Sequence, residues 1–244
     1  REILPSITKP VLTYGLDYEA DISACIMKHE GNKTWFKVSR KNCMDWMEIE
    51  LNLPGKHNVL NALAAITVAH ELGIREEAII SALRNFQGIA RRCQILGEIA
   101  INNSKLLLVD DYAHHPREIA ATLQALHTGW PGRRLIVVFQ PHRYTRTRDL
   151  FEDFTHVLSE VDELFLLEMY PAGEAPIAGA DSRSLCRAIR QRGHMEPIFV
   201  EDREEISTLL ARNVRDNDIL VVLGAGDIGA LAPLLMQQYG AARI

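Results

Sequence analysis

The chain has 244 residues, of which 47% are hydrophobic and 24% are charged, and its formal net charge is −5. These values are typical of a globular protein of one or two domains and argue against intrinsic disorder. The mild negative charge gives no reason to expect nucleic acid or an anionic membrane as a partner, and no run of 18 apolar residues is present that could span a bilayer.

The cysteines and the first residues give a cellular context. The four cysteines lie far apart without a C-x-x-C pair, so we expect neither a disulfide framework nor a zinc site, and we expect a cytoplasmic protein. The chain begins Arg1-Glu2-Ile3, without an initiator Met or a signal-peptide pattern. We therefore expect it to be part of a longer protein.

Short β-type segments come first along the chain. Alternation of apolar and polar residues predicts strands at 11–14, 21–26, 34–38 and 47–51. The turn-like residues 30–33 favour antiparallel hairpins.

Two helices are predicted next. Apolar residues repeat at intervals of three and four from Asn58 to Leu72, where Gly73 is a natural helix end, and a second helix is predicted at 76–86. Both periodicities stop at 87–92, which we interpret as a hinge. The predicted domains are therefore residues 1–90 and 91–244.

After the hinge, strand and helix patterns alternate. Strands are predicted at 105–111, 135–140, 163–169, 197–201 and 219–223. Helices are predicted at 117–128, 147–160, 182–192, 203–213 and 228–239. Strands separated by helices of this length need crossover connections, so we predict an α/β fold whose mostly parallel sheet has helices on both faces.

Chemically rich segments follow two of the apolar runs. Residues 110–116 read Asp-Asp-Tyr-Ala-His-His-Pro, and residues 140–148 read Gln-Pro-His-Arg-Tyr-Thr-Arg-Thr-Arg. Ligands bind outside the carboxyl ends of the strands in open α/β sheets, so we expect both segments to line one crevice. Two acids, three histidines and three arginines there suggest anionic, nucleotide-like chemistry.

These residues also have plainer interpretations. The acids at 110 and 111 could hold a ribose or a metal, but one could simply cap the following helix. The histidines at 114 and 115 could act as a base, contact substrate or be structural. Arginines at 143, 146 and 148 would oppose the helix dipole by ~0.3–1 kcal/mol as a basic first turn, and a bound anion would remove that conflict.

Two further segments could contact a nucleotide. Asn58 and Asn61 share one helix face, and an Asn amide can both donate to and accept from an adenine edge. The alternative is that Asn58 is an N-cap and Asn61 an exposed residue. The guanidinium groups of Arg91 and Arg92 at the hinge could bind phosphates, or the pair could be a solvated linker.

The sequence Gly-Ala-Gly-Asp-Ile-Gly at 224–229 fits G-x-G-x-x-G, a dinucleotide-binding fingerprint. That fingerprint should open a βαβ unit with an acid about 20 residues later, whereas here the chain ends first. We therefore favour a tight strand-to-helix turn. No G-x-x-x-x-G-K-[ST] phosphate loop is present.

Taken in order, these segments resemble the Mur ligase family. The resemblance rests on G-K-H-N-V-L-N at 55–61, G-I-A-R-R at 88–92, the two segments at 110–116 and 140–148, Y-P-A-G-E-A-P-I at 170–177 and G-A-G-D-I-G at 224–229. It implies three domains in the intact protein: one for UDP-sugar, a central ATPase and a Rossmann-like C-terminal domain. This chain resembles the β-hairpin and helical tail of the second and all of the third.

The resemblance also implies a reaction. Within the family, the chain is most similar to members that use ATP to convert the lactyl carboxylate of UDP-N-acetylmuramate to an acyl phosphate, which L-alanine then attacks. The phosphate-loop lysine and the magnesium ligands would lie upstream of Arg1, so no metal ligand is expected here and this polypeptide alone should be inactive.

Site residues follow from the same resemblance, position by position. His57, Asn58 and Asn61 would contact adenine, Arg92 the phosphates and Asp111 the ribose. The L-alanine and muramoyl side would be lined by Tyr112 (also counted among the nucleotide-binding residues), His114, Arg143 and Arg146. The last three of these are the residues we expect to be catalytic.

Three other functions remain open. One is a related ligase that joins murein tripeptide to the same UDP-sugar. The second is a non-catalytic module that binds adenine nucleotides. The third is a nicotinamide oxidoreductase that uses residues 224–229.

Overall fold

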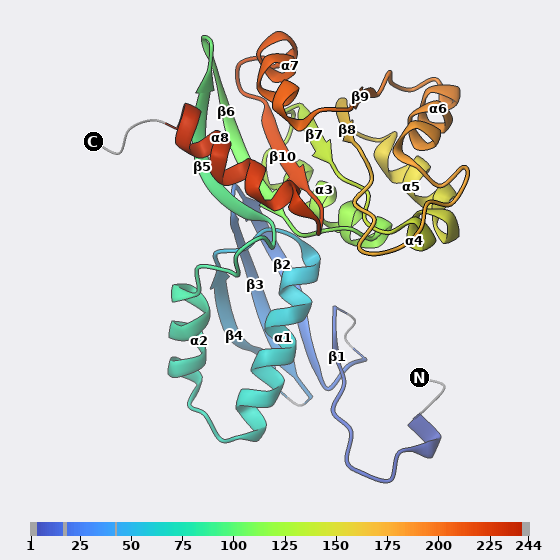
Figure 1. Cartoon of the computed structure of the whole chain (residues 1–244). Coiled ribbons are helices and arrows are strands. Elements are labelled where there is room, and N and C mark those ends of the chain that lie inside the picture. Colours follow the sequence, from blue (N-terminus) through green and yellow to red (C-terminus); the bar gives the residue numbers. More distant parts are fainter. Residues whose placement is uncertain (1–3, 17–18, 42, 241–244) are drawn as a thin grey trace. The chain divides into compact units, whose positions relative to one another are not determined.

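The computed structural model describes residues 4–16, 19–41 and 43–240. Residues 1–3, from which the sequence analysis predicts that the chain is part of a longer protein, lie outside the described residues. Contacts divide the chain into two compact units: residues 1–88 with 128–130, and residues 89–127 with 131–244. Figure 1 shows the elements of each unit. No helix among the described residues is long and apolar enough to cross a membrane.

The first unit is a sheet packed against helices. Its elements are η1 (Leu4–Ser6), β1 (Tyr14–Gly15), β2 (Ile22–Glu30), β3 (Lys33–Arg40), β4 (Cys43–Leu51), α1 (Lys56–Glu71) and α2 (Glu76–Asn85). The strand order is β1-β2-β3-β4, and β2, β3 and β4 pair antiparallel. Alternate side chains such as Phe36, Val38 and Ile49 form a core with Leu63 and Ile66 of α1.

Three of the predicted strands and both helices of this unit are confirmed, with changes at their ends. The segment predicted as a strand at 11–14 contributes only Tyr14 to β1, which pairs parallel with β2 rather than in a hairpin. Helix α1 begins at Lys56, two residues before the predicted Asn58. Gly73 ends the helix as expected, with φ +70° and its N–H donating to the His70 carbonyl at 2.9 Å.

The second unit is an α/β sandwich. It contains β5 (Gln94–Ile101), β6 (Ser104–Asp111), α3 (Pro116–Gly129), β7 (Leu135–Phe139), α4 (Tyr144–Asp149), α5 (Phe151–Leu158), β8 (Glu163–Leu167), α6 (Ser182–Arg192), β9 (Ile198–Val200), η2 (Arg203–Glu205), α7 (Ile206–Asn213), β10 (Ile219–Leu223), η3 (Asp227–Ala230) and α8 (Leu231–Tyr239). The strand order is β5-β6-β10-β7-β8-β9, and all pairs are parallel except β5 with β6. The predicted α/β class with a mostly parallel sheet is confirmed.

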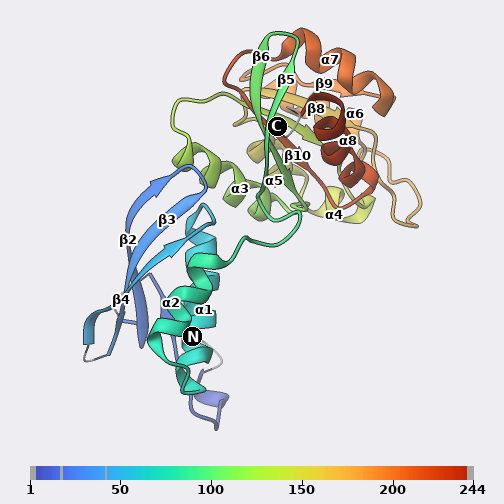
Figure 2. The same cartoon turned by 90° about the vertical axis from the view of Figure 1, so that its left-hand side faces the viewer.

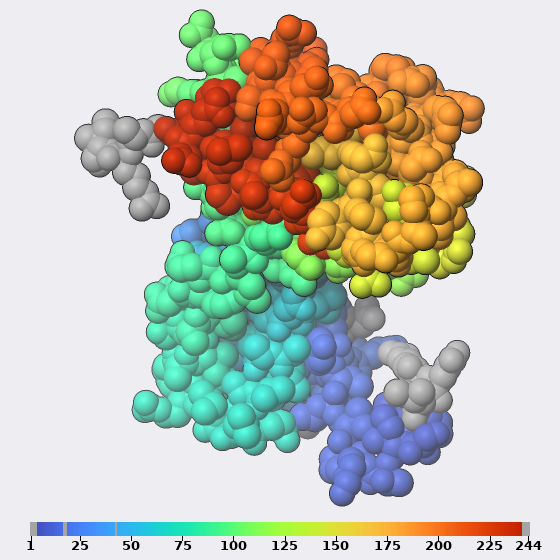
Figure 3. Space-filling model, in the orientation of Figure 1, coloured from blue at the N-terminus to red at the C-terminus, as the bar shows by residue number. Residues whose placement is uncertain are grey.

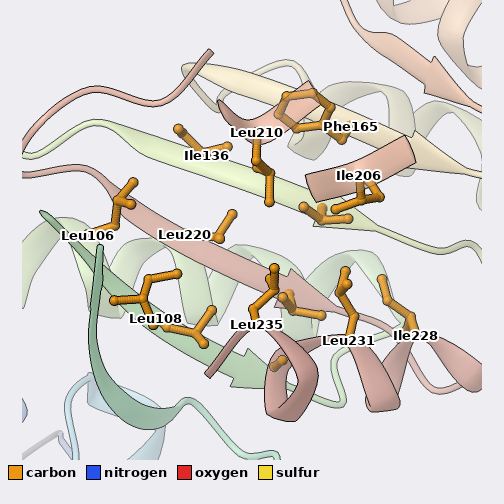
Figure 4. Packing of buried hydrophobic residues seen from close by; sticks show 14 of the residues in the cluster. Leu106, Leu108, Ile136, Phe165, Ile206, Leu210, Leu220, Ile228, Leu231 and Leu235 are labelled. Carbon is orange, nitrogen blue, oxygen red and sulfur yellow. The ribbon is translucent and has the colours of Figure 1, made fainter. Parts of the chain in front are cut away.

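Helices cover both faces of this sheet, as Figure 2 shows from the side. On one face, Leu108 of β6 and Leu220 of β10 belong to a buried cluster with Ile206 of α7 and Leu235 of α8 (Figure 4). On the other, Phe139 of β7 lies against Phe154 of α5, with ring centroids 5.9 Å apart. In the space-filling view, η3 and α8 (red) form part of the surface over the first of these faces (Figure 3).

The structure differs from the sequence analysis of this unit at one helix and one strand. The helix predicted at 147–160 is two helices that meet at Leu150, whose φ of −119° is not helical, and the first begins earlier, at Tyr144. Strand β5 was not predicted. Its pairing with β6 shifts register between Ile95 and Gly97, and this irregularity interrupts the alternation that would have revealed it.

Candidate functional site

The carboxyl ends of β6, β10 and β7 lie at one edge of the sheet. Leu223 at the end of β10 is in register with Asp111 of β6 on one side and with Phe139 of β7 on the other. Beyond these pairs, the Gly224 N–H donates to the Asp111 carbonyl at 3.1 Å. The segments after β6 and β7 therefore leave the sheet at the same edge, with β10 placed between them.

The two acids at the end of β6 face opposite sides of the sheet. Asp111 is 4% exposed, and its carboxylate accepts hydrogen bonds from the Cys93 N–H at 3.0 Å, the Ala113 N–H at 2.9 Å and the Thr122 hydroxyl at 2.6 Å. Burial raises the pKa of Asp111, and these hydrogen bonds oppose that rise. The contacts hold the turn after β6, so a contact with a ribose would require these bonds to be exchanged.

Asp110 instead pairs with Arg91. Arg91 Nε lies 3.5 Å from a carboxylate oxygen of Asp110, and its Nη2 donates to the Gly224 carbonyl. Burial raises the pKa of Asp110, while the Arg91 charge opposes the rise. The other Asp110 oxygen and Arg91 Nε are buried without a hydrogen-bond partner in the structure. This pair joins the hinge segment to the turn after β10.

The two adjacent arginines therefore differ in environment. The side chain of Arg91 is 26% exposed, whereas that of Arg92 is 54% exposed. The Arg92 guanidinium lies 5.6 Å from the Tyr112 ring centre and 3.9 Å from Glu118. Because more than half of its side chain is exposed, it remains accessible to an anion. Glu118 also caps α3, because its carboxylate accepts from the N–H groups of His114 and His115 at 3.1 and 3.2 Å. Neither Asp110 nor Asp111 is the helix cap.

Four aromatic rings at the sheet edge form a row in which each ring lies close to the next. Tyr112 and His114 contact edge to face with centroids 5.3 Å apart, and His114 and His142 are 6.0 Å apart. His142 stacks on Tyr170 at 5.3 Å with an interplanar angle of 13°. His115, by contrast, accepts from the Arg117 N–H at 3.3 Å through Nδ1 at the start of α3. The structure thus brings His114 to His142 rather than to its sequence neighbour.

Arg143 and Arg146 have different partners. Arg146 Nη1 lies 3.0 Å from the His142 carbonyl and 3.3 Å from His142 Nδ1. Arg143 has a φ of +75°, rare for a residue with a side chain, and its N–H donates to the Tyr170 carbonyl at 2.9 Å. Its half-exposed guanidinium lies 3.7 Å from Glu174. Arg148 pairs with Asp149 on the surface at 2.8 Å.

Side chains of the same chain occupy the space beside the glycines at 224–229. A Cβ at Gly226 would collide with Gln140 Oε1 and would lie 2.7 Å from Tyr170 Cγ, and a Cβ at Gly229 would meet the Arg91 guanidinium. Gln140 also accepts from the Ile228 N–H and donates to Asp227 at 2.7 Å. These glycines permit close internal packing, which argues against the nicotinamide alternative.

In the first unit, the start of α1 presents one of the two predicted asparagines. Gly55 is the N-cap, with φ +92° and no side-chain cap, so Asn58 is not a cap. Asn58 is buried, and its amide donates to the Pro54 carbonyl at 2.8 Å. Asn61 is exposed, and its amide nitrogen lies 3.5 Å from Asn58 Oδ1. His57, within the first turn of the same helix, is half-buried.

Sequence reasoning missed several residues at the sheet edge. His142 was noted only as part of a motif, and Arg91 was considered only as a phosphate ligand or a linker residue. Tyr170 and Glu174 were given no role, although all four residues lie within the motifs of the resemblance. Their shared position in these motifs was the available signal. Among the described residues, no group of three His, Cys, Asp or Glu side chains is placed to hold a metal ion.

Comparison with known families matches both parts of the chain. Residues 91–226 match the Mur ligase, glutamate ligase domain, and residues 1–69 match the Mur ligase middle domain. The chain belongs to the Mur ligase family. The first of these matches alone covers more than half of this Mur ligase chain.

Solved structures agree with this family. The chain is similar to UDP-N-acetylmuramate–alanine ligase from Thermotoga maritima, with 26% identity and a TM-score of 0.76 over 93% of this chain and 47% of that one. A murein peptide ligase from Psychrobacter arcticus has 21% identity and a TM-score of 0.58 over 95% of this chain and 47% of its own. Folylpolyglutamate synthase from Thermotoga maritima has 17% identity and a TM-score of 0.62 over 90% and 48%. The last two show the shared fold alone, and the chain spans about half the length of these relatives.

Proposed function

We propose that this chain forms the C-terminal half of an ATP-dependent ligase that joins L-alanine to UDP-N-acetylmuramate in peptidoglycan precursor synthesis. Membership of the Mur ligase family supports the reaction class, and the similarity to the alanine ligase from Thermotoga maritima supports the substrate. A carboxylate is a poor electrophile, and its phosphorylation by ATP supplies a leaving group that an amine can displace.

The observation that carries the proposal is the group of His114, His142 and Arg143 at the carboxyl edge of the parallel sheet. The two rings lie 6.0 Å apart, and Arg143 follows His142 directly with a half-exposed guanidinium. A planar guanidinium can bind both oxygens of an amino-acid carboxylate. The amino group of the same molecule would then meet the histidines, where it can lose a proton.

ATP would use the residues that remain accessible. Asn61 offers an exposed amide for the adenine edge, and Arg92 offers an exposed guanidinium for the phosphates. His57 lies in the first turn of α1, one turn before Asn61, and would also face the base. The magnesium ion and the phosphate-loop lysine would be held by residues outside this chain, because its sequence contains no phosphate loop.

Release of phosphate tests this function. We expect the full-length gene product to release phosphate from ATP only when UDP-N-acetylmuramate and L-alanine are both present. We expect the 244-residue chain alone to melt cooperatively but to release none, because ATP lacks the amide cradle and lysine that neutralise its phosphates.

A substrate panel separates the alternatives. Murein tripeptide in place of L-alanine as the preferred acceptor amine would assign the recycling ligase. Nucleotide binding without turnover by the full-length protein would assign a non-catalytic module. Turnover by the isolated chain would contradict the division of the active site proposed here.

A further inference from the structure

The two neighbouring histidines at the sheet edge have opposite hydrogen-bonding patterns. His114 Nδ1 lies 2.9 Å from the carbonyl oxygen of Tyr112. A carbonyl can only accept, so this Nδ1 carries the proton. In the neutral ring of His114, Nε2 therefore has a free lone pair that can accept a proton.

His142 has the other arrangement. Its Nδ1 lies 3.3 Å from Nη1 of Arg146, and a guanidinium can only donate. Nδ1 therefore accepts, and the proton of the neutral His142 ring is on Nε2. The Tyr170 ring stacks on His142 at 5.3 Å, and Arg146 also binds the His142 carbonyl at 3.0 Å, so both the plane and the tautomer of the ring are fixed.

The charges around His142 favour its neutral form. Burial lowers the pKa of His142, and Arg146, His114 and Arg143 lower it further, while Glu174 acts in the opposite direction. Tyr170, from the neighbouring loop, packs its ring against that of His142. His142 can therefore donate a hydrogen bond without being a cation.

We propose that His142 is a catalytic residue that donates a hydrogen bond from Nε2 to the carbonyl oxygen of the acyl phosphate, while Nε2 of His114 accepts a proton from the incoming amino group. Arg146 and Tyr170 are positioning residues that fix the His142 ring. This inference rests on the proposed function, because the acyl phosphate and the amino acid are the reactants of that ligase.

The proton and electron pairs balance in this step. His114 Nε2 takes one proton from the ammonium group, which leaves a neutral amine. The nitrogen lone pair forms the C–N bond, and the negative charge that develops on the carbonyl oxygen is stabilised by the His142 Nε2–H. The C–O bond to the phosphate then breaks with its electron pair, and the phosphate carries away the second nitrogen proton.

The tautomers can be measured on this chain directly. In a long-range ¹H–¹⁵N spectrum of ¹⁵N-histidine-labelled protein at pH 7, we expect His142 to be neutral with its proton on Nε2, and the neutral ring form of His114 to carry its proton on Nδ1. Signals are assigned with His114→Gln and His142→Gln. His142 should also stay neutral to a pH below the ordinary value of 6.5. A charged His142 at pH 7, or the same tautomer on both rings, would overturn the proposal.

Kinetics of the full-length protein test the roles. The amide N–H of His142→Gln lies near the position of Nε2, whereas that of His142→Asn lies near Nδ1. We expect His142→Asn to lower kcat about 100-fold, as for loss of an oxyanion donor, and His142→Gln to recover at least about a tenth of the wild-type rate. His114→Gln should lower kcat/KM for L-alanine by about 100-fold or more, because an amide cannot accept the proton of the amino group.

A matched control and a folding check make the outcomes clear. His156, an exposed residue of α5 beside Glu160, provides the control variant His156→Gln, which should have the wild-type rate. Circular dichroism melts confirm that each variant is folded. If the wild type turns over and His142→Asn has the same kcat, this inference alone is overturned. If the wild type shows no alanine-dependent turnover, the proposed function is overturned as well.

Discussion

Glu174 binds the first turn of α4 through Thr145. Its carboxylate accepts the Thr145 N–H at 3.0 Å and the Thr145 hydroxyl at 2.7 Å, and Arg143 lies 3.7 Å away. A negative charge is favourable at this position because the first N–H groups of a helix have no partner within it. The negative charge that offsets the arginines at the start of α4 is therefore the carboxylate of Glu174. Helix α4 needs no bound ligand to form.

Glu174→Gln should reduce the loss of stability in acid. Hydrogen bonds from Thr145, the backbone N–H first, lower the pKa of Glu174 below its ordinary value of 4.5. The stabilisation from a lowered carboxyl pKa is complete above the unfolded value and disappears as pH falls through the folded value. Urea unfolding at pH 7 and at pH 3 measures this, and the variant should lose less stability between the two than the wild type.

The control for this experiment is Glu204→Gln, which removes an exposed carboxylate from η2. It should leave the difference between the two pH values as in the wild type. A Glu174→Gln variant with the wild-type acid dependence would show that Thr145 does not hold the carboxylate in solution.

Arg91→Ala should destabilise the second unit far more than Arg92→Ala. Arg91 is the ion-pair partner of Asp110, which is 2% exposed, and removal of one member of a buried pair costs ~3–5 kcal/mol. Arg92 is half-exposed, so its loss should change the free energy of unfolding by about 0.5 kcal/mol or less. Denaturant unfolding followed by circular dichroism compares the two.

The Arg91→Ala variant should also be less stable at higher pH. Burial already raises the pKa of Asp110 above 3.8, and loss of the Arg91 charge removes a contribution that opposes this rise. The folded state then binds a proton that the unfolded state has released, so stability falls as pH rises through that range. A variant with equal stability from pH 4 to pH 8 would contradict this description of Asp110.

Gly226→Ala should disturb the stack of His142 and Tyr170. The added methyl group would lie 2.7 Å from Tyr170 Cγ, and overpacking of this kind costs ~1–3 kcal/mol. Gly132→Ala is the contrasting variant, because its methyl group would meet no atom within 4 Å and only its φ of +79° is unfavourable. Histidine NMR signals report the result, and His142 should shift in the first variant and not in the second.

Asn58 and Asn61 should separate stability from nucleotide binding. Asn58→Ala removes the hydrogen-bond donor of the buried Pro54 carbonyl and should destabilise the first unit by ~1–3 kcal/mol. Asn61→Ala should leave the melting temperature unchanged and raise the KM for ATP of the full-length protein roughly two- to twelve-fold, the value of one neutral hydrogen bond. A change in melting temperature alone for Asn61→Ala would assign it a structural role.

Arg143→Lys should weaken the binding of L-alanine and not of ATP. A lysine ammonium cannot bind both carboxylate oxygens in the manner of a guanidinium, and a charged hydrogen bond is worth ~1.5–3 kcal/mol. We expect the KM for L-alanine to rise on the order of ten- to a hundred-fold, with Arg212→Lys of α7 as the control. A raised KM for ATP instead would assign Arg143 to the nucleotide phosphates.

The sequence by itself determined the α/β class, most of the strands and helices, and the edge at which polar residues gather. Apolar runs such as 219–223 mark buried parallel strands, and the polar segments after β6 and β7 mark their carboxyl ends. These features are local, because they depend on the period of the chain and on residues close in sequence. The predicted nucleotide and substrate roles of individual residues remain predictions.

Only the tertiary structure decided which residues meet at that edge. Strand β10 is inserted between β6 and β7 although it comes last among the strands of the described residues, and this order places Gly224 beside Gln140 and Asp111. Strand alternation then directs Asp110 toward Arg91 and Asp111 toward α3, and the loop after β8 supplies Tyr170 and Glu174. Such contacts join residues far apart in the chain, and the free energy that selects them comes from packing the whole sheet, so no local pattern records them.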